Sequence, residues 1–160
     1  LFVILGLFFV EVNHETYSLK YDVFRSMWTK NIKDVTDNII SINNTQIIGL
    51  SFKEKESGDE IRKRLVDLGY DNSKPSMVLL HDPKNSIALA DLGVSLVLSG
   101  HTHGGQFFPA NLMVKNIYKS FSHGINYTKN TIGITTYGVG TALMTLRIGT
   151  IPEIVILEIS

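Results

Sequence analysis

Two short apolar runs joined by a helical stretch limit most strongly what this chain can fold into. Residues 76–80 read SMVLL and residues 94–98 read VSLVL, each about the length of a buried strand. Between them, residues 86–92 have the pattern of a short helix. A strand, a crossover helix and a second strand of the same sheet place the two strands parallel. The sequence therefore predicts a βαβ unit and an α/β fold.

The rest of the chain is expected to alternate strands and helices within one domain, residues 1–160. Ser57 and Glu60 form a capping box, which predicts a helix that ends at Gly69. The turn residues Asn43-Asn44 predict a hairpin within residues 38–51. The other predicted elements are a buried strand at 7–12, a helix from Thr16 to about Lys33, a loop-like stretch at 107–131, and strands at 132–137 and 153–159.

Composition excludes several classes of function and site. Lysine and arginine number 15, as do aspartate and glutamate, so no basic field favours nucleic acid. The absence of cysteine excludes disulfides and thiolate metal sites. The apolar run at residues 1–10 is shorter than the roughly 20 residues of a membrane span, so we expect a buried strand there. Because the chain begins within such a run, we expect it to be the C-terminal part of a larger domain.

Three of the five histidines follow the two central strands. His81 comes directly after residues 76–80, and His101 and His103 come just after residues 94–98. Because the carboxyl ends of parallel strands meet at one edge, His81 and His101 should lie side by side, and His103 should point from the same loop. Neutral imidazole is a common ligand of Zn, Mn, Fe and Ni. One histidine after a strand is more often an ordinary polar residue, but glycines at 100, 104 and 105 allow positive φ and close approach, which favours a metal site.

Two of these segments resemble a known superfamily. Residues 100–106 (GHTHGGQ), preceded by 79–83 (LLHDP), resemble the calcineurin-like metallophosphoesterases. The most similar branch is bacterial in type and includes membrane-associated phosphodiesterases and UDP-2,3-diacylglucosamine diphosphatases. Residues 12–15 (VNHE) and 137–159 (YGVGTALMTLRIGTIPEIVILEI) extend the resemblance over nearly the whole chain. It implies a four-layer αββα sandwich whose N-terminal half is missing here.

The resemblance also implies an activity and a set of roles. The activity is hydrolysis of a phosphodiester or pyrophosphate by a two-metal site, with a metal-bound hydroxide as nucleophile. The ions would be divalent Mn, Fe, Zn or Ni, and the substrate a phosphate ester, either a small molecule or lipid-linked. By motif position, Asn13, His81 and His101 resemble ligands of one ion, His103 resembles a ligand of the other, His14 resembles the group that assists the leaving group, and Gly104, Gly105 and Gln106 resemble the substrate-facing rim.

The chain departs from the superfamily pattern in ways that bear on activity. It contains no Asp-x-His, and its one Gly-Asp, Gly58-Asp59, comes after the Asn-His motif instead of before it. The carboxylate that bridges the two metals is therefore missing, and we expect the isolated chain to be inactive. Val12 stands where the superfamily has glycine, and a β-branched residue disfavours positive φ.

Alternatives remain open for the motifs and for the function. Asn13-His14 could instead cap a helix, and His123, which matches no ligand of the superfamily, is expected to be a surface loop residue. The alternative function is a non-catalytic remnant or an interaction module that binds a single metal. Membrane association would require a segment upstream of residue 1, since none of the residues here forms a long enough apolar run.

Overall fold

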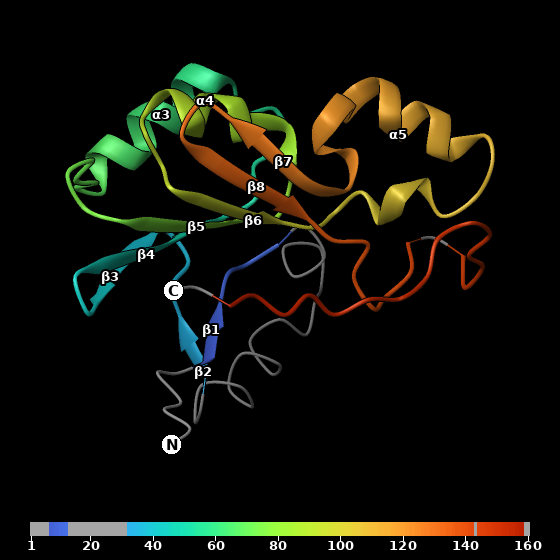
Figure 1. Ribbon diagram of the computed structural model, residues 1–160, viewed down its shortest axis with the longest axis horizontal. Coiled ribbons are helices and arrows are strands. Elements are labelled where there is room, and N and C mark those ends of the chain that lie inside the picture. Colours follow the sequence, from blue (N-terminus) through green and yellow to red (C-terminus); the bar gives the residue numbers. More distant parts are fainter. Residues whose placement is uncertain (1–6, 13–31, 143, 159–160) are drawn as a thin grey trace.

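The computed structural model describes residues 7–12, 32–142 and 144–158, which form a mixed sheet with helices (Figure 1). The sheet has six strands in the order β3-β4-β5-β6-β8-β7. The four inner strands run parallel, and the two edge strands, β3 and β7, run antiparallel to their neighbours. The strands span Asn38–Ile42 (β3), Thr45–Leu50 (β4), Ser76–Leu80 (β5), Leu96–Ser99 (β6), Gly124–Thr128 (β7) and Thr131–Thr135 (β8).

Helices α3 (Gly58–Asp67) and α4 (Ser86–Asp91) cover one face of this sheet (Figure 1). A short 3₁₀ turn, η1 (Pro83–Asn85), leads from β5 into α4. β5 and β6 are parallel neighbours joined through α4, so the predicted βαβ unit is confirmed. Apolar side chains of the strands and helices form the core, which contains Ile48, Leu50, Ile61, Leu65, Val78, Leu80, Ala88, Leu89, Val94 and Val97.

The opposite face of the sheet is also apolar. Ile47, Met77, Leu96 and Ile132 are register partners across four strands, and all are at least partly exposed. In Figure 1 the small parallel ladder of β1 (Leu7–Phe9) with β2 (Ile32–Asp34) and the C-terminal segment lie on this side. Leu157 of that segment lines a hollow together with Met77, Leu96 and Ile132. Among the described residues no helix is long and apolar enough to cross a membrane.

The predicted hairpin turn and the predicted helix cap are both confirmed. β3 and β4 form the predicted hairpin, and its turn residues Asn43 and Asn44 have φ of 47° and 67°. Asparagine tolerates this left-handed conformation, which a two-residue hairpin turn requires. The capping box of Ser57 and Glu60 begins α3, and Gly69 follows the helix with φ of 88°.

Several predicted elements differ from the structure. The predicted helix to Lys33 is wrong at its end, because residues 32–34 form strand β2 beside β1; the rest of it, 16–31, lies outside the described residues. The stretch at 107–131 is not a loop but contains α5 (Ala110–Tyr118), the 3₁₀ turn η3 (Lys119–Ser122) and β7. Residues 153–158 form no strand. β1 covers only Leu7–Phe9, and Leu7 is exposed.

The reason that α5 was missed lies in its pattern of burial. It has no side-chain cap at its start that would mark it in the sequence, and none of its residues is buried, so its apolar side chains do not face the core of the sheet. Leu112, Met113 and Ile117 are all more than half exposed. We therefore infer that α5 forms because it packs against the loop that follows β6.

The Ser57→Ala substitution should destabilise the fold through α3. The Ser57 hydroxyl accepts a hydrogen bond from the Glu60 amide at 3.2 Å, and loss of such a cap costs about 1 kcal/mol. Urea unfolding should show this loss, while Ser57→Asn, which keeps a side-chain acceptor, should retain most of the stability. Equal destabilisation by both substitutions would contradict a capping role.

Candidate functional site

The site lies where β5 and β6 end. His81 follows the last residue of β5, and His101 lies two residues beyond β6. Nε2 of His81 and Nδ1 of His101 are 3.1 Å apart, and the ring centroids are 4.8 Å apart at 75°. The predicted side-by-side placement of these two histidines is confirmed, because the parallel strands end at the same edge of the sheet.

The separation of the two nitrogens suits shared coordination of one ion. Two imidazole nitrogens that bind one ion at about 2.0–2.1 Å, with an angle of about 90–110° between them, lie about 2.8–3.4 Å apart. The observed 3.1 Å falls within this range. In the part of the chain that the structure describes, no group of three or more histidine, aspartate or glutamate side chains could hold a metal. The histidine pair could thus supply two ligands of a site, and further ligands must come from elsewhere.

The loop after β6 has an unusual backbone. His101, His103 and Gln106 have φ of 64°, 46° and 58°, a left-handed conformation that residues other than glycine rarely adopt. Strain of this kind persists only where surrounding structure enforces it, and it concentrates at functional sites. Gly104 and Gly105 also have positive φ, whereas Gly100 does not. The loop is therefore held in a costly shape that places both histidine side chains.

Gly104 and Gly105 allow this loop to pack closely on other parts of the protein. A Cβ added at Gly104 would lie 2.2 Å from Cε1 of Tyr137, and one at Gly105 would lie 2.4 Å from the backbone nitrogen of Asn111. The absence of side chains is thus explained by contacts within the protein. Contact of these two glycines with a substrate stays a prediction.

His103 points to a different partner from the histidine pair. Its Nδ1 lies 3.3 Å from Nη2 of Arg147, which also donates to the carbonyls of Tyr137, Gly138 and Gly140. Burial and the neighbouring Arg147 lower the pKa of His103 below its ordinary value. The ring is therefore held neutral, which is the form that binds a metal.

Gln106 joins this loop to the C-terminal segment. Its side-chain amide donates to the Ala142 carbonyl at 2.8 Å and accepts from the Ala142 amide at 2.7 Å, and its backbone carbonyl accepts from Ile148. The side chain is 5% exposed. Both amide atoms are thus engaged within the protein, and the predicted contact of Gln106 with a substrate is not tested by this arrangement.

A second set of contacts joins the C-terminal segment to β8. Glu153 accepts hydrogen bonds from the Tyr137 amide at 2.7 Å and the Thr136 hydroxyl at 2.8 Å, and it pairs with His123 at 3.1 Å. The rings of His123 and Tyr137 stack with centroids 3.5 Å apart. His123 is therefore half-buried and bonded, more than was expected of a surface loop residue. Tyr137 in turn packs on Gly104, so these contacts reach the loop of the site.

Glu153 should make the stability of the fold depend on pH. Burial raises the pKa of Glu153, but hydrogen bonds from Tyr137 and Thr136 and the nearby His123 lower it more, so it lies below the ordinary 4.5. A depressed pKa adds stability above the ordinary value, and this stability is lost as pH falls through the folded value. Glu153→Gln should therefore be less stable than the wild type at pH 7, and the difference should shrink below about pH 4.5. Urea unfolding across this range is the measurement, and a pH-independent difference would contradict it.

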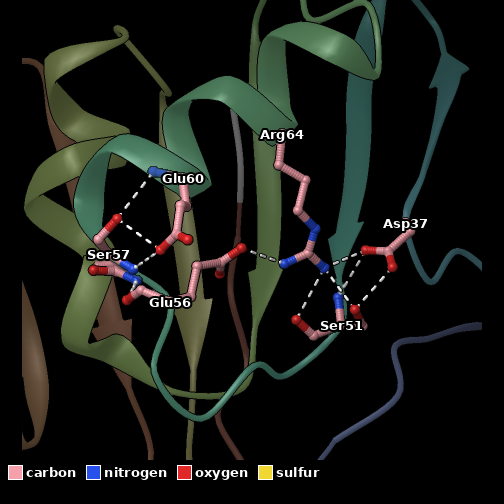
Figure 2. A network of polar contacts seen from close by, with 7 residues as sticks. Asp37, Ser51, Glu56, Ser57, Glu60 and Arg64 are labelled. Carbon is pink, nitrogen blue, oxygen red and sulfur yellow. Dashed lines mark hydrogen bonds and ion pairs between the residues drawn. The ribbon is translucent and has the colours of Figure 1, made fainter.

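A polar network fixes the loop between β4 and α3 (Figure 2). Arg64 of α3 donates to Glu56 at 2.8 Å, to the carbonyl and hydroxyl of Ser51, and to Asp37. Burial raises the pKa of Asp37, yet the hydrogen bonds from Arg64 and Ser51 lower it to a net value below the ordinary one. The network holds Ser51, and the next residue, Phe52, packs against both histidines of the pair.

Tyr118, the last residue of α5, is a site residue that the sequence did not indicate. Its ring lies edge-on to His101, with centroids 6.4 Å apart, and its hydroxyl lies near the carboxylate of Asp82, the residue after His81. Burial and the Asp82 carboxylate raise the pKa of Tyr118 to about 12, so it stays protonated at neutral pH. No motif links residues 82 and 118 in the sequence, since α5 itself was not predicted. Asn13 and His14, by contrast, were predicted site residues but lie outside the described residues.

Comparison with known proteins gives this geometry a context. Over 125 residues, or 75% of the chain, the sequence is 31% identical to an uncharacterized metallophosphoesterase of Helicobacter pylori. A second relative, an uncharacterized metallophosphoesterase of Campylobacter jejuni, is 31% identical over 160 residues, or 96% of the chain. The chain is related to uncharacterized metallophosphoesterases. A match of this extent necessarily includes the histidine pair and the loop after β6.

The chain aligns with only part of each of these metallophosphoesterases. The chain spans 33% of the Helicobacter relative and 42% of the Campylobacter relative. A metallophosphoesterase of Bacillus subtilis, also uncharacterized, is 33% identical over 84 residues. Neither a protein-family model nor a solved structure matches the chain. The metallophosphoesterase relationship thus rests on sequence similarity to these longer proteins.

Proposed function

We propose that this chain is part of a metal-dependent phosphoesterase of the calcineurin-like superfamily, which hydrolyses a phosphodiester or a pyrophosphate. The observation that carries the proposal is the 3.1 Å separation of Nε2 of His81 and Nδ1 of His101 at the ends of two parallel strands. Relatives named metallophosphoesterases support the same class of reaction. The proposed cofactors are two divalent ions, of Mn, Fe, Zn or Ni.

The proposal assigns the following roles to residues of this chain. His81 and His101, with Asn13, would hold one ion, and His103 would contribute to the other. His14 would donate a hydrogen bond or proton to the leaving oxygen. Gly104, Gly105 and Gln106 would shape the rim against the substrate. Two divalent ions, when bound, polarise the phosphoryl group and lower the pKa of water.

The remaining ligands would come from another part of the protein. The apolar second face of the sheet supports this view, because partly exposed Ile47, Met77, Leu96 and Ile132 form a continuous row there. A second sheet packed on this row would complete a four-layer αββα sandwich. In this arrangement the missing Asp-x-His and Gly-Asp motifs would bring the bridging carboxylate to the edge where the histidines lie.

The test uses the full-length protein and bis-p-nitrophenyl phosphate. We expect Mn²⁺-dependent hydrolysis by the full-length wild type and none by the 160-residue chain alone, because this chain brings no bridging carboxylate to the site. In the full-length protein, His103→Ala should reduce the metal content from two ions towards one. His14→Ala should lower turnover with the metal content unchanged. Robust hydrolysis by the isolated chain would contradict the division of ligands proposed here.

A second candidate, a protein that binds a single metal without catalysis, has one observation in its favour. Within the described residues His103 contacts Arg147 and backbone carbonyls, and no third ligand joins the histidine pair. Metal analysis of the full-length protein separates the two candidates. Two ions per chain with turnover support the phosphoesterase, whereas one ion without turnover supports the binding protein.

A further inference from the structure

Two aromatic rings from separate elements pack on the histidine pair. Phe52, in the loop after β4, lies 5.7 Å from His101 with the rings tilted by 30°, and 6.1 Å from His81 with the rings at 81°. Tyr118, at the end of α5, lies 6.4 Å from His101 at 74°. These distances are those of aromatic pairs in direct contact. The orientation of each imidazole is thus limited by a neighbouring ring.

The hydroxyl of Tyr118 adds a polar link to the same pair. It lies near the carboxylate of Asp82, the residue that follows His81 in the chain. Oδ1 of Asp82 accepts from the Lys84 amide at 2.9 Å, which caps the turn η1. Tyr118 therefore touches His101 with its ring and reaches the neighbour of His81 with its hydroxyl. One side chain of α5 thus lies beside His101 and near the residue that follows His81.

Phe52 is in turn held by buried charges. The preceding residue, Ser51, bonds Arg64 through both its carbonyl at 2.9 Å and its hydroxyl at 2.6 Å (Figure 2). Arg64 is paired with Glu56, and their side chains are only 11% and 6% exposed. A ring in this position has little freedom to move away from the histidines. The loop after β4 thereby acts on the pair through Phe52.

We propose that Phe52 and Tyr118 are positioning residues that hold the imidazoles of His81 and His101 in the orientation that binds one divalent ion. The inference rests on the proposed function, because it assumes that the pair binds a metal. Both residues act through the histidines and are assigned no contact with the ion or the substrate. Partners that orient a ligating imidazole typically change metal affinity by 10–100-fold when they are removed.

The experiment is a Co²⁺ titration of the full-length protein after its metal has been removed with a chelator. The signal is the part of the visible Co²⁺ absorption that is lost in His81→Ala. This difference reports Co²⁺ bound by the histidine pair and excludes Co²⁺ bound at other sites. We expect Tyr118→Leu and Phe52→Leu each to weaken this binding by about tenfold and to shift the absorption bands. A loss of fold alone would not shift the bands of protein that remains bound.

Matched controls come from exposed aromatic residues. Tyr127 is 77% exposed and Phe108 is 72% exposed, so Tyr127→Leu and Phe108→Leu should leave the affinity within about twofold of the wild type, against the tenfold expected above. Thermal melting shows which variants fold. If Phe52→Leu does not fold, Tyr118→Leu decides alone, because it removes the ring that lies edge-on to His101.

The possible outcomes separate this inference from the proposed function. Unchanged affinity and bands in Tyr118→Leu and Phe52→Leu, with binding still lost in His81→Ala, would overturn the inference and leave the metal site intact. Equal weakening in the exposed controls would overturn it as well. The absence of any His81-dependent Co²⁺ absorption in the wild type would overturn both the inference and the metal site.

Discussion

Replacement of His101 by alanine should reduce the affinity of the full-length protein for divalent metal by at least about a hundredfold, more than the loss of a residue that only orients a ligand. The substitution removes Nδ1 of His101 and leaves Nε2 of His81 without its neighbour at 3.1 Å. Isothermal titration with Mn²⁺ and metal analysis of the purified protein are the measurements. Phosphoesterase activity should fall in parallel, because the chemistry depends on the bound ions.

His123→Gln is the matched control for this prediction. His123 is a histidine of the same chain, but it stacks on Tyr137 and pairs with Glu153 instead of joining the pair. We expect its loss to lower stability modestly and to leave the metal affinity unchanged. If His101→Ala and His123→Gln weakened metal binding equally, the site would not be at the ends of β5 and β6.

Replacement of Gly105 by alanine should destabilise the protein by about 2–5 kcal/mol. Gly105 has φ of 77°, which costs an L-residue about 1–2 kcal/mol. In addition, a Cβ there would lie 2.4 Å from the Asn111 nitrogen and 2.5 Å from its Cα, and backbone atoms cannot move aside cheaply. Overpacking of this kind costs a further 1–3 kcal/mol or so. Urea unfolding gives the change in free energy.

Gly93→Ala separates the two contributions to this cost. Gly93 has φ of 80°, but nothing lies within 4 Å of a Cβ added there. It should therefore show only the conformational cost of about 1–2 kcal/mol. Equal destabilisation at the two positions would mean that the loop after β6 is free to shift and is not held against α5. The metal affinity of Gly105→Ala should then also be unaffected.

The part of the site that could be predicted from sequence is the part carried by regular strands. Residues 76–80 and 94–98 are short apolar runs, and the crossover between them requires parallel strands. The edge at which such strands end is then determined, and His81 and His101 must meet there. The helix cap of Ser57 with Glu60 and the hairpin turn at Asn43-Asn44 could also be predicted. Caps and tight turns depend on residues only one to three positions apart.

The contacts that hold the loop after β6 could not be predicted in the same way. Gln106 bonds Ala142, and Arg147 contacts His103, across 36 and 44 positions of irregular chain. Such segments have no periodicity, so the sequence does not indicate which residues meet. The same holds for Tyr118, whose hydroxyl reaches Asp82 from a helix without a buried face.

The sequence by itself determined the α/β class, the parallel pair of β5 and β6, and the meeting of His81 with His101. Each follows from local periodicity and from the geometry of a crossover, which depend on neighbouring residues. Only the tertiary structure decided that α5 forms and that hydrogen bonds join the C-terminal segment to the loop of the site. It also decided that the rings of Phe52 and Tyr118 pack around the histidines. These depend on the packing of segments far apart in the chain, where the energy of a contact arises only once the sheet has brought its partners together.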